Sequence, residues 1–196
     1  MAEGMRVLDG IEIPAPGVWE LDRAHTRLGF VARHLMVTRV RGNFGVFGGA
    51  ITVGERPEDS KVEVRIDAAS IDTGTKDRDT HLRSPDFLDV EKYPELTFRS
   101  TKVERVGTNS LQVEGDLTIR EVTRPVVLEA EFEGLTDDPW GNKRIGFTAT
   151  TEIDREDWGM TWNVALEKGG LLVSKKVQIE LDVEAAFKSE AGDAAA

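Results

Sequence analysis

Three histidines, His25, His34 and His81, are the side chains of this sequence that titrate nearest to neutral pH. His25 follows Asp22 by three residues, and His81 lies in a strongly polar segment. Imidazole and carboxylate groups of this kind could transfer protons or bind a metal ion. No HxH or HxxxH spacing places two histidines on one face of an element, however. We therefore expect structural hydrogen bonds near the ends of elements, and no metal site.

A mixed-charge cluster follows, made of Arg78, Asp79, Arg83 and Asp86. Its alternation of signs is typical of a solvated helix face or a local ion-pair network. It could equally shape the mouth of a pocket, and the sequence leaves both interpretations open.

Signatures of catalysis and nucleotide binding are absent from the sequence. It contains no cysteine, which excludes a thiol nucleophile, Cys-ligated zinc and disulfides. It contains no GxGxxG, Walker A, HExxH, GxSxG or EF-hand pattern. The glycines between Gly42 and Gly49 have the wrong spacing for a phosphate loop and indicate a curved strand. We expect no cofactor and no catalytic residues.

The elements that would position these groups are strands, because apolar and polar residues alternate strictly over much of the chain. The clearest runs are 62–68, 112–120, 126–133, 145–153 and 177–185, and weaker ones are 18–21, 27–33, 44–53 and 96–106. Turn residues separate them at 54–57, 107–109 and 137–142. This pattern predicts eight or nine antiparallel strands, each with one solvated face.

Two segments, 75–83 and 160–170, interrupt the alternation and could be short helices or ordered loops. We find no repeat and no interdomain linker. The sequence predicts a flexible N-terminal arm over 1–16, one domain over 17–187 and a disordered tail over 188–196.

An all-β sheet of this size must hide its edges, either by closing into a barrel or by stacking as a sandwich. Small residues at inward positions, such as Gly115, Ala130 and Ala149, would underfill a tight core and favour an eight-stranded barrel with room for a ligand. In the alternative sandwich, these small residues would interlock with large ones.

Composition excludes several partners. The 196 residues carry 25 basic and 36 acidic side chains, so the formal net charge is −11. Broad contact with nucleic acid or with an anionic bilayer would be repelled. No apolar run approaches the ~20 residues of a membrane helix, so stable membrane insertion is not expected. The N-terminus has no apolar core of a signal peptide, and we expect the cytoplasm.

Several segments in order resemble the YceI-like polyisoprenoid-binding family, over residues 17–187. They are Leu21-Asp22-x-x-His25, Phe30-x-x-x-His34, Gly42-Asn43-Phe44 with Phe47, Ser70-Ile71-Asp72-Thr73-Gly74, Arg78-Asp79-x-His81-Leu82-Arg83-Ser84-x-Asp86-Phe87, Tyr93-Pro94-x-Leu96-Thr97-Phe98-x-Ser100, Gly115-Asp116-Leu117-Thr118-Ile119, Val122-Thr123-Arg124-Pro125-Val126 and Asp154-Arg155-x-Asp157-Trp158-Gly159-Met160. The resemblance implies an extended lipocalin-like, antiparallel eight-stranded barrel that holds an isoprenoid chain, as in a polyprenyl diphosphate or quinone. Many bacterial relatives are exported to the periplasm with a signal that this sequence lacks.

Combined with the alternation, the resemblance implies which side chains meet the ligand. We expect the tail to contact Trp19, Phe30, Val64, Ile66, Phe98, Leu117, Ile119, Leu128, Phe132, Phe147, Ile179 and Leu181. We expect His34, Arg78 and His81 to offer donors to a diphosphate or quinone oxygen. The partner is then an isoprenoid lipid, and a homodimer is left open.

Three functions compete. The first is non-enzymatic binding, storage or transport of a long-chain isoprenoid lipid. The second is an enzyme that acts on a lipid-like substrate, with Asp22, His25 and His81 as acid and base. The third is a stress-related interaction protein whose cavity is incidental. The absence of a recognisable nucleophile or metal set favours the first.

Overall fold

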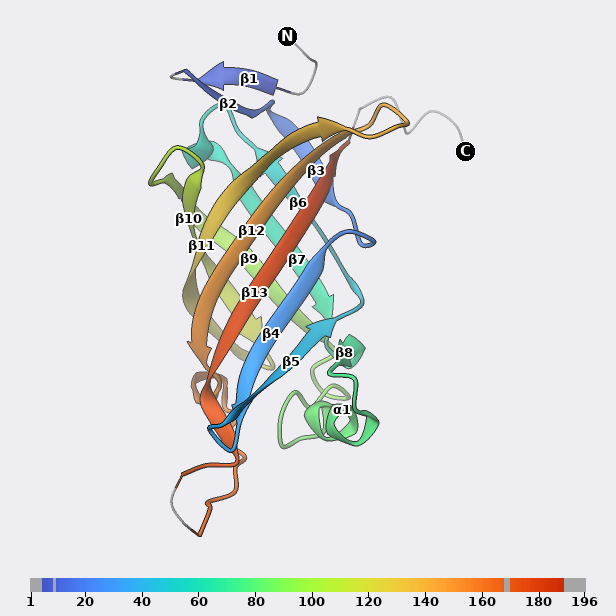
Figure 1. The fold of residues 1–196 in the computed structure, drawn as a ribbon, viewed down its shortest axis with the longest axis vertical. Helices are drawn as coiled ribbons and strands as arrows, with labels where there is room; N and C mark the ends of the chain where they lie inside the picture. Colours follow the sequence, from blue (N-terminus) through green and yellow to red (C-terminus); the bar gives the residue numbers. More distant parts are fainter. Residues whose placement is uncertain (1–4, 9, 168–169, 189–196) are drawn as a thin grey trace.

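The computed structural model describes residues 5–8, 10–167 and 170–188. Its described part is built mainly of strands (Figure 1). They are β1 (Met5–Leu8), β2 (Ile11–Pro14), β3 (Gly17–Leu21), β4 (Arg27–His34), β5 (Thr38–Phe44), β6 (Phe47–Val53), β7 (Lys61–Asp67), β8 (Ile71–Asp72), β9 (Glu95–Arg105), β10 (Ser110–Ile119), β11 (Val122–Asp137), β12 (Lys143–Asp154) and β13 (Val173–Phe187). One α-helix, α1 (Lys76–Arg83), and 3-10 turns at Pro57–Asp59, Ala68–Ser70 and Arg155–Trp158 complete the set.

Eight of these strands close into a barrel. The order is β12-β11-β10-β9-β7-β6-β3-β13, and β13 returns to β12 to complete the ring. Each of these pairings is antiparallel. Closure leaves no free edge between these strands, and it gives the sheet an inner face that strict alternation can fill with apolar side chains. The predicted antiparallel eight-stranded barrel is confirmed.

A second group of strands extends the sheet along one half of β13. β13 pairs with β12 over most of its length, with β3 near its end at Ala185–Phe187, and with β4 between Val173 and Asp182. β5 and β8 follow β4 in the sheet. β13 therefore belongs to both groups, and it joins the closed ring to the strands β4, β5 and β8.

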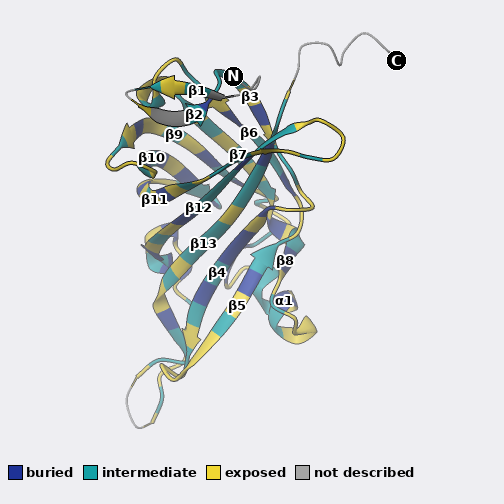
Figure 2. Cartoon of the chain, turned by 45° about the horizontal axis from the view of Figure 1, so that its top comes forward, coloured by how far each residue is buried: buried dark blue, intermediate teal, exposed yellow. Residues whose placement is uncertain are grey.

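Each end of the barrel has a covering element (Figure 1). The hairpin of β1 and β2 lies across the upper end, and the Arg6 guanidinium ties it to the barrel by an ion pair with Glu55 (2.7 Å). At the lower end, α1 lies beside β8. Buried residues follow the inner face of the strands between these ends, whereas the turns are exposed (Figure 2).

Some predicted elements differ from the observed ones. Of the two segments left open as short helices or ordered loops, 75–83 contains the helix α1, whereas no helix forms in the described residues of 160–170, where Ala165 forms an isolated β-bridge with Leu171. The glycine-rich run is two strands rather than one curved strand, because the chain turns at Gly45 and Val46.

The ends of the chain were predicted to be a flexible arm and a disordered tail. Within 1–16, residues 5–8 and 11–14 pair as the β1–β2 hairpin. Residues 189–196 of the predicted tail lie outside the described residues.

The small inward residues do not all leave empty space. A Cβ added at Gly115 would lie 2.4 Å from the Phe98 ring, and one added at Gly42 would lie 2.4 Å from the Phe30 ring. These glycines therefore make room for aromatic rings from the neighbouring strands. Small and large residues interlock here inside a barrel, and not only in a sandwich. No helix in the described part of the chain is long and apolar enough to span a membrane.

Candidate functional site

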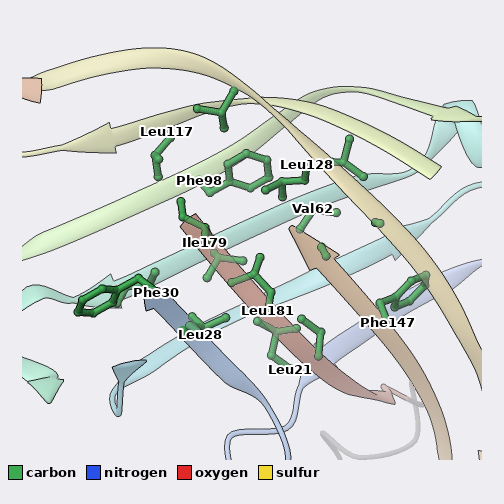
Figure 3. Close-up of a pocket in the computed structure, with 18 of the residues that line it drawn as sticks. Leu21, Leu28, Phe30, Val62, Phe98, Leu117, Leu128, Phe147, Ile179 and Leu181 are labelled. Atoms are coloured by element: carbon green, nitrogen blue, oxygen red, sulfur yellow. The ribbon is translucent and has the colours of Figure 1, made fainter. Parts of the chain in front are cut away.

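An apolar cavity of about 350 Å³ occupies the barrel interior. Leu28, Phe98, Leu117 and Ile179, from four different strands, converge on it together with the other labelled side chains (Figure 3). Because almost all of the lining atoms are hydrocarbon, the cavity offers dispersion and hydrophobic contact along its wall and few hydrogen-bonding groups.

Strand β13 illustrates how the sequence builds this wall. Val177, Ile179, Leu181 and Val183 line the cavity, whereas the intervening residues 178, 180 and 182 are polar and do not. Successive side chains of a strand point to opposite faces, so this alternation fixes which face looks inward. A shift of one residue in register would place carboxylates in the cavity.

The structure places eleven of the twelve predicted tail residues on the cavity wall. They are Phe30, Val64, Ile66, Phe98, Leu117, Ile119, Leu128, Phe132, Phe147, Ile179 and Leu181. Their position follows from the alternation, but their contact with a lipid stays a prediction.

Trp19 is the exception, because it does not line the cavity. Its side chain is fully buried in a separate cluster with Ile51, Ile145 and Ala185. The ring packs edge-on against Phe187 at 4.9 Å, and the indole N–H donates to the Ala15 carbonyl. Trp19 therefore acts as packing at this end of the barrel.

Sequence reasoning missed part of the wall. Leu82 of α1, together with Phe87 and Leu88 after it, also lines the cavity. The polar composition of this segment concealed them, because only a few of its residues turn inward. Pro85, which ends the helical pattern just before two apolar residues, is the local signal that could have indicated them.

None of the three predicted head-group residues lines the cavity. The Arg78 side chain is turned to the segment before α1: its Nε donates to the Thr73 hydroxyl (2.7 Å), and a terminal nitrogen donates to the Thr73 carbonyl (2.9 Å). The buried Asp79 carboxylate accepts from the same Thr73 through its amide and hydroxyl. Both charged groups therefore hold this turn in place.

The two histidines are engaged elsewhere as well. The His81 ring contacts Asp86 through Nε2 (2.8 Å) and packs edge-on against Trp162 and Phe87. His34 ends β4 at the turn into β5, where it pairs with Thr38. The mixed-charge cluster is thus a local hydrogen-bonding network that fixes α1 and the turns beside it.

Three arginines line the cavity, Arg6, Arg105 and Arg155, and Arg155 is the one that is buried. Its side chain is only 3% exposed, and its guanidinium donates to the backbone carbonyls of Ser174 and Met160. The remaining terminal nitrogen, NH2, is buried without a hydrogen-bond partner. Burial lowers the pKa of Arg155 and outweighs the neighbouring carboxylates of Glu156 and Asp154, which raise it. Among the described residues, no carboxylate lies within ion-pair distance of it.

Polar groups also occur at the end covered by the β1–β2 hairpin. Arg6, Arg105 and Asn109 contribute to the wall there. Nε of Arg6 and one terminal nitrogen of Arg105 are buried without a partner, but Arg6 is already paired with Glu55. The polar atoms of the cavity are thus concentrated at its two ends.

The acid–base residues of the enzyme hypothesis do not form one site. Asp22, His25 and Glu184 do come together, with ligand atoms within 4.8 Å of one another. None of them lines the cavity, and the Arg144 guanidinium pairs with both carboxylates. Burial raises the pKa of Asp22, but the hydrogen bonds from Ala24, His25 and Arg144 outweigh it and lower that pKa overall. The cluster is an ion-pair network that joins β12 and β13 to the turn after β3.

The chain was compared with known proteins. The family model of the YceI-like domain matches residues 19–185. Protein YceI of Escherichia coli O157:H7 is 42% identical over 161 residues, covering 82% of this chain and 81% of the relative. The crystal structure of a YceI protein from Campylobacter jejuni superposes with a TM-score of 0.69 at 31% identity, covering 80% of this chain and 90% of that one.

A third protein has the same fold at lower identity. It is a polyisoprenoid binding domain from Saccharophagus degradans, with a TM-score of 0.68 and 17% identity, covering 89% of this chain and all of that one. Because the family model spans most of the described barrel, from β3 to β13, these matches cover the cavity wall as well as the fold. The chain belongs to the YceI-like family.

Proposed function

We propose that this protein binds a long-chain isoprenoid lipid inside its barrel, and that it stores or transports the lipid without changing it chemically. The observation that carries the proposal is the cavity itself, whose wall is apolar between the few polar groups at its two ends. The polyisoprenoid binding domain of Saccharophagus degradans, which shares the fold, supports this choice of ligand.

The driving force would come from the tail. Removing apolar surface from water contributes about 2.5 kcal/mol for each ~100 Å². A tail of several isoprene units therefore supplies enough free energy to offset the entropy lost when it is ordered. A branched, unsaturated hydrocarbon also suits a wall of leucine, isoleucine, valine and phenylalanine, since it needs no hydrogen bonds along its length.

Arg155 is the best-placed group to receive the polar head, in place of His34, Arg78 and His81. It is the most buried of the three arginines that line the cavity, and its NH2 nitrogen, which has no partner within the protein, would donate to an oxygen of a diphosphate or a quinone. The three residues predicted from sequence use their polar atoms on neighbouring protein groups or lie at a turn outside the wall.

The geometry does not favour the enzyme hypothesis. Asp22 and His25 lie outside the cavity wall, and His81 contacts neither of them. A lipid in the barrel would therefore not meet the three groups together, as acid–base catalysis requires.

Native mass spectrometry of the purified protein, followed by extraction of the retained ligand, tests the proposal. Leu117→Glu places a charge in the cavity, where nothing offsets its desolvation, and we expect the folded variant to retain less than a tenth of the lipid. Val127→Glu is the matched control, because Val127 is 45% exposed on the outer face of β11. If a folded Leu117→Glu variant carries as much prenyl lipid as the wild type, the cavity is not the binding site.

A further inference from the structure

The turn between β4 and β5 exposes three consecutive apolar side chains. Leu35 is 42% exposed, Met36 is 51% exposed and Val37 is 78% exposed. They lie at the lower extremity of the two strands, in the part of Figure 2 coloured as exposed. Single exposed apolar residues are ordinary, but three consecutive ones at the end of one hairpin place exposed apolar surface together.

The backbone of this turn is costly for these residue types. A hydrogen bond from the Val37 amide to the His34 carbonyl (3.0 Å) closes it, and both central residues have positive φ, 52° at Leu35 and 60° at Met36. Asn and Gly adopt this left-handed region with least strain, and hairpin turns of this sign normally use them. Leucine and methionine at these positions therefore reduce folding stability, and their exposed side chains are available for contact outside the fold.

The strands that carry the turn add a second unfavourable feature. Arg33 on β4 lies directly opposite Arg39 on β5, and like charges in this position repel. Both side chains are exposed, and no carboxylate of the described residues pairs with either of them.

Two further cations complete the surface. Lys175 and Lys176 of β13 share one shallow depression with Arg33, Met36 and Arg39. Glu152 is the acidic residue lining it and lies 3.8 Å from Lys176, while Lys175 pairs with Glu156. The region therefore keeps a positive excess, although the chain as a whole carries −11.

We propose that this surface, the basic tip (Arg33, Leu35, Met36, Val37, Arg39, Lys175 and Lys176), docks the protein onto an anionic lipid bilayer. An apolar turn with cations beside it is complementary to a bilayer, because the turn can enter the interface while the cations meet anionic head groups. The overall negative charge repels broad contact with such a surface, so it would orient the molecule with the tip toward the membrane and the acidic barrel away.

The tip is directly connected to the cavity wall. The Arg33 amide donates to the Ser174 hydroxyl (2.9 Å), and Arg155 donates to the carbonyl of the same Ser174 (3.0 Å). Docking would therefore bring the Arg155 end of the cavity toward the membrane. The docking proposal stands on the surface alone and does not rest on the identity of the cargo.

Vesicle flotation of the full chain tests whether the basic tip docks onto an anionic bilayer. Vesicles of equal parts phosphatidylglycerol and phosphatidylcholine are compared with vesicles of phosphatidylcholine alone. We expect binding to the anionic vesicles only, and weaker binding as added salt screens the charges. Arg33→Gln with Arg39→Gln should reduce the partition coefficient about 25-fold, since each cation contributes about fivefold. Arg65→Gln with Arg99→Gln is the control, because it makes the same charge change at exposed residues of β7 and β9 and should leave binding unchanged.

A second variant separates docking from folding. Leu35→Asn with Met36→Gly gives the turn the residues that its backbone prefers, so the thermal midpoint should stay or rise while vesicle binding falls more than tenfold. The proposal is overturned if the wild type binds both vesicle types equally or neither, if the control pair loses as much binding as the tip pair, or if the stabilised turn binds like the wild type.

Discussion

Arg155 combines two roles that are usually separate. Its guanidinium bonds to the carbonyls of Ser174 and Met160, which ties the start of β13 to the segment after β12. The same group, on a residue that lines the cavity, leaves one buried nitrogen, NH2, without a partner. An arginine stays protonated despite a lowered pKa, so the charge remains at neutral pH. A ligand oxygen at NH2 would satisfy the donor and offset part of the desolvation.

We predict that Arg155→Gln discriminates between head groups. Removal of the cation costs a charged acceptor more binding free energy than a neutral one. The affinity for a prenyl diphosphate should therefore fall more than tenfold, and the affinity for a quinone of equal tail length by only a few fold. Titration of the delipidated variant with both ligands measures this difference.

The matched control is Arg124→Gln, since Arg124 is exposed and also donates to a backbone carbonyl, that of Asp157. It should change neither affinity. Equal losses for the two ligands in Arg155→Gln would mean that Arg155 only supports the fold.

At the scale of elements, the strict alternation of apolar and polar residues was the most informative part of the sequence. It located the long strands and their inward faces, because a half-solvated strand must alternate. It could not identify which strands pair, since the pairing of β13 with β4 and β3 joins residues at least 139 positions apart. The β1–β2 hairpin and the break at Gly45 escaped notice because their runs are too short to establish a period.

The candidate site, like the fold, could be predicted only in part from the sequence. The apolar wall follows from alternation, whereas the burial of Arg155 arises only when β13 packs on the segment after β12. His34, Arg78 and His81 were plausible donors by chemical type, but type alone does not say which neighbours occupy their polar atoms. In the structure, polar atoms of Arg78 and His81 bond locally to Thr73 and Asp86.

The hairpin of β1 and β2 supplies a prediction at this scale. Ile13, Pro14 and Arg6 line the cavity at the upper end, so removal of residues 1–14 should open that end and speed the release of a bound prenyl lipid severalfold. Transfer of a fluorescent prenyl probe to acceptor vesicles measures the rate, and circular dichroism confirms that the barrel remains folded.

Arg56→Gln is the appropriate comparison, because it breaks the Arg56–Asp59 ion pair near the same end but leaves the hairpin in place. Its release rate should match the wild type. An unchanged rate in the deletion would show that the hairpin does not restrict exit.

At the scale of the whole molecule, the barrel encloses a long apolar cavity. The few polar groups of the cavity wall lie at its two ends. In the proposed complex, tail contacts would be spread over many strands, whereas head contacts would be limited to groups such as Arg155. The net charge of −11 also opposes an anionic head at long range. Affinity should therefore depend more on the tail than on the head.

We predict that halving the prenyl tail weakens binding more than exchanging a diphosphate for a neutral quinone head. The expected loss from the shorter tail exceeds a hundredfold, because each buried isoprene unit contributes several CH₂ equivalents at about 0.8 kcal/mol each. A titration series that varies head and tail separately decides the order. Affinity that followed the head and ignored tail length would point to surface recognition instead.

The position of β13 at the end of the described chain also affects how the protein folds. It is the last described strand, yet it closes the ring against β12 and supplies the partner for both β3 and β4 near the start of the chain. During synthesis, the early strands must therefore wait with unpaired edges until β13 has left the ribosome. Such dependence on distant contacts slows folding and lengthens the period in which nascent chains can aggregate. Expression of this protein should accordingly depend on chaperones that hold unfinished chains.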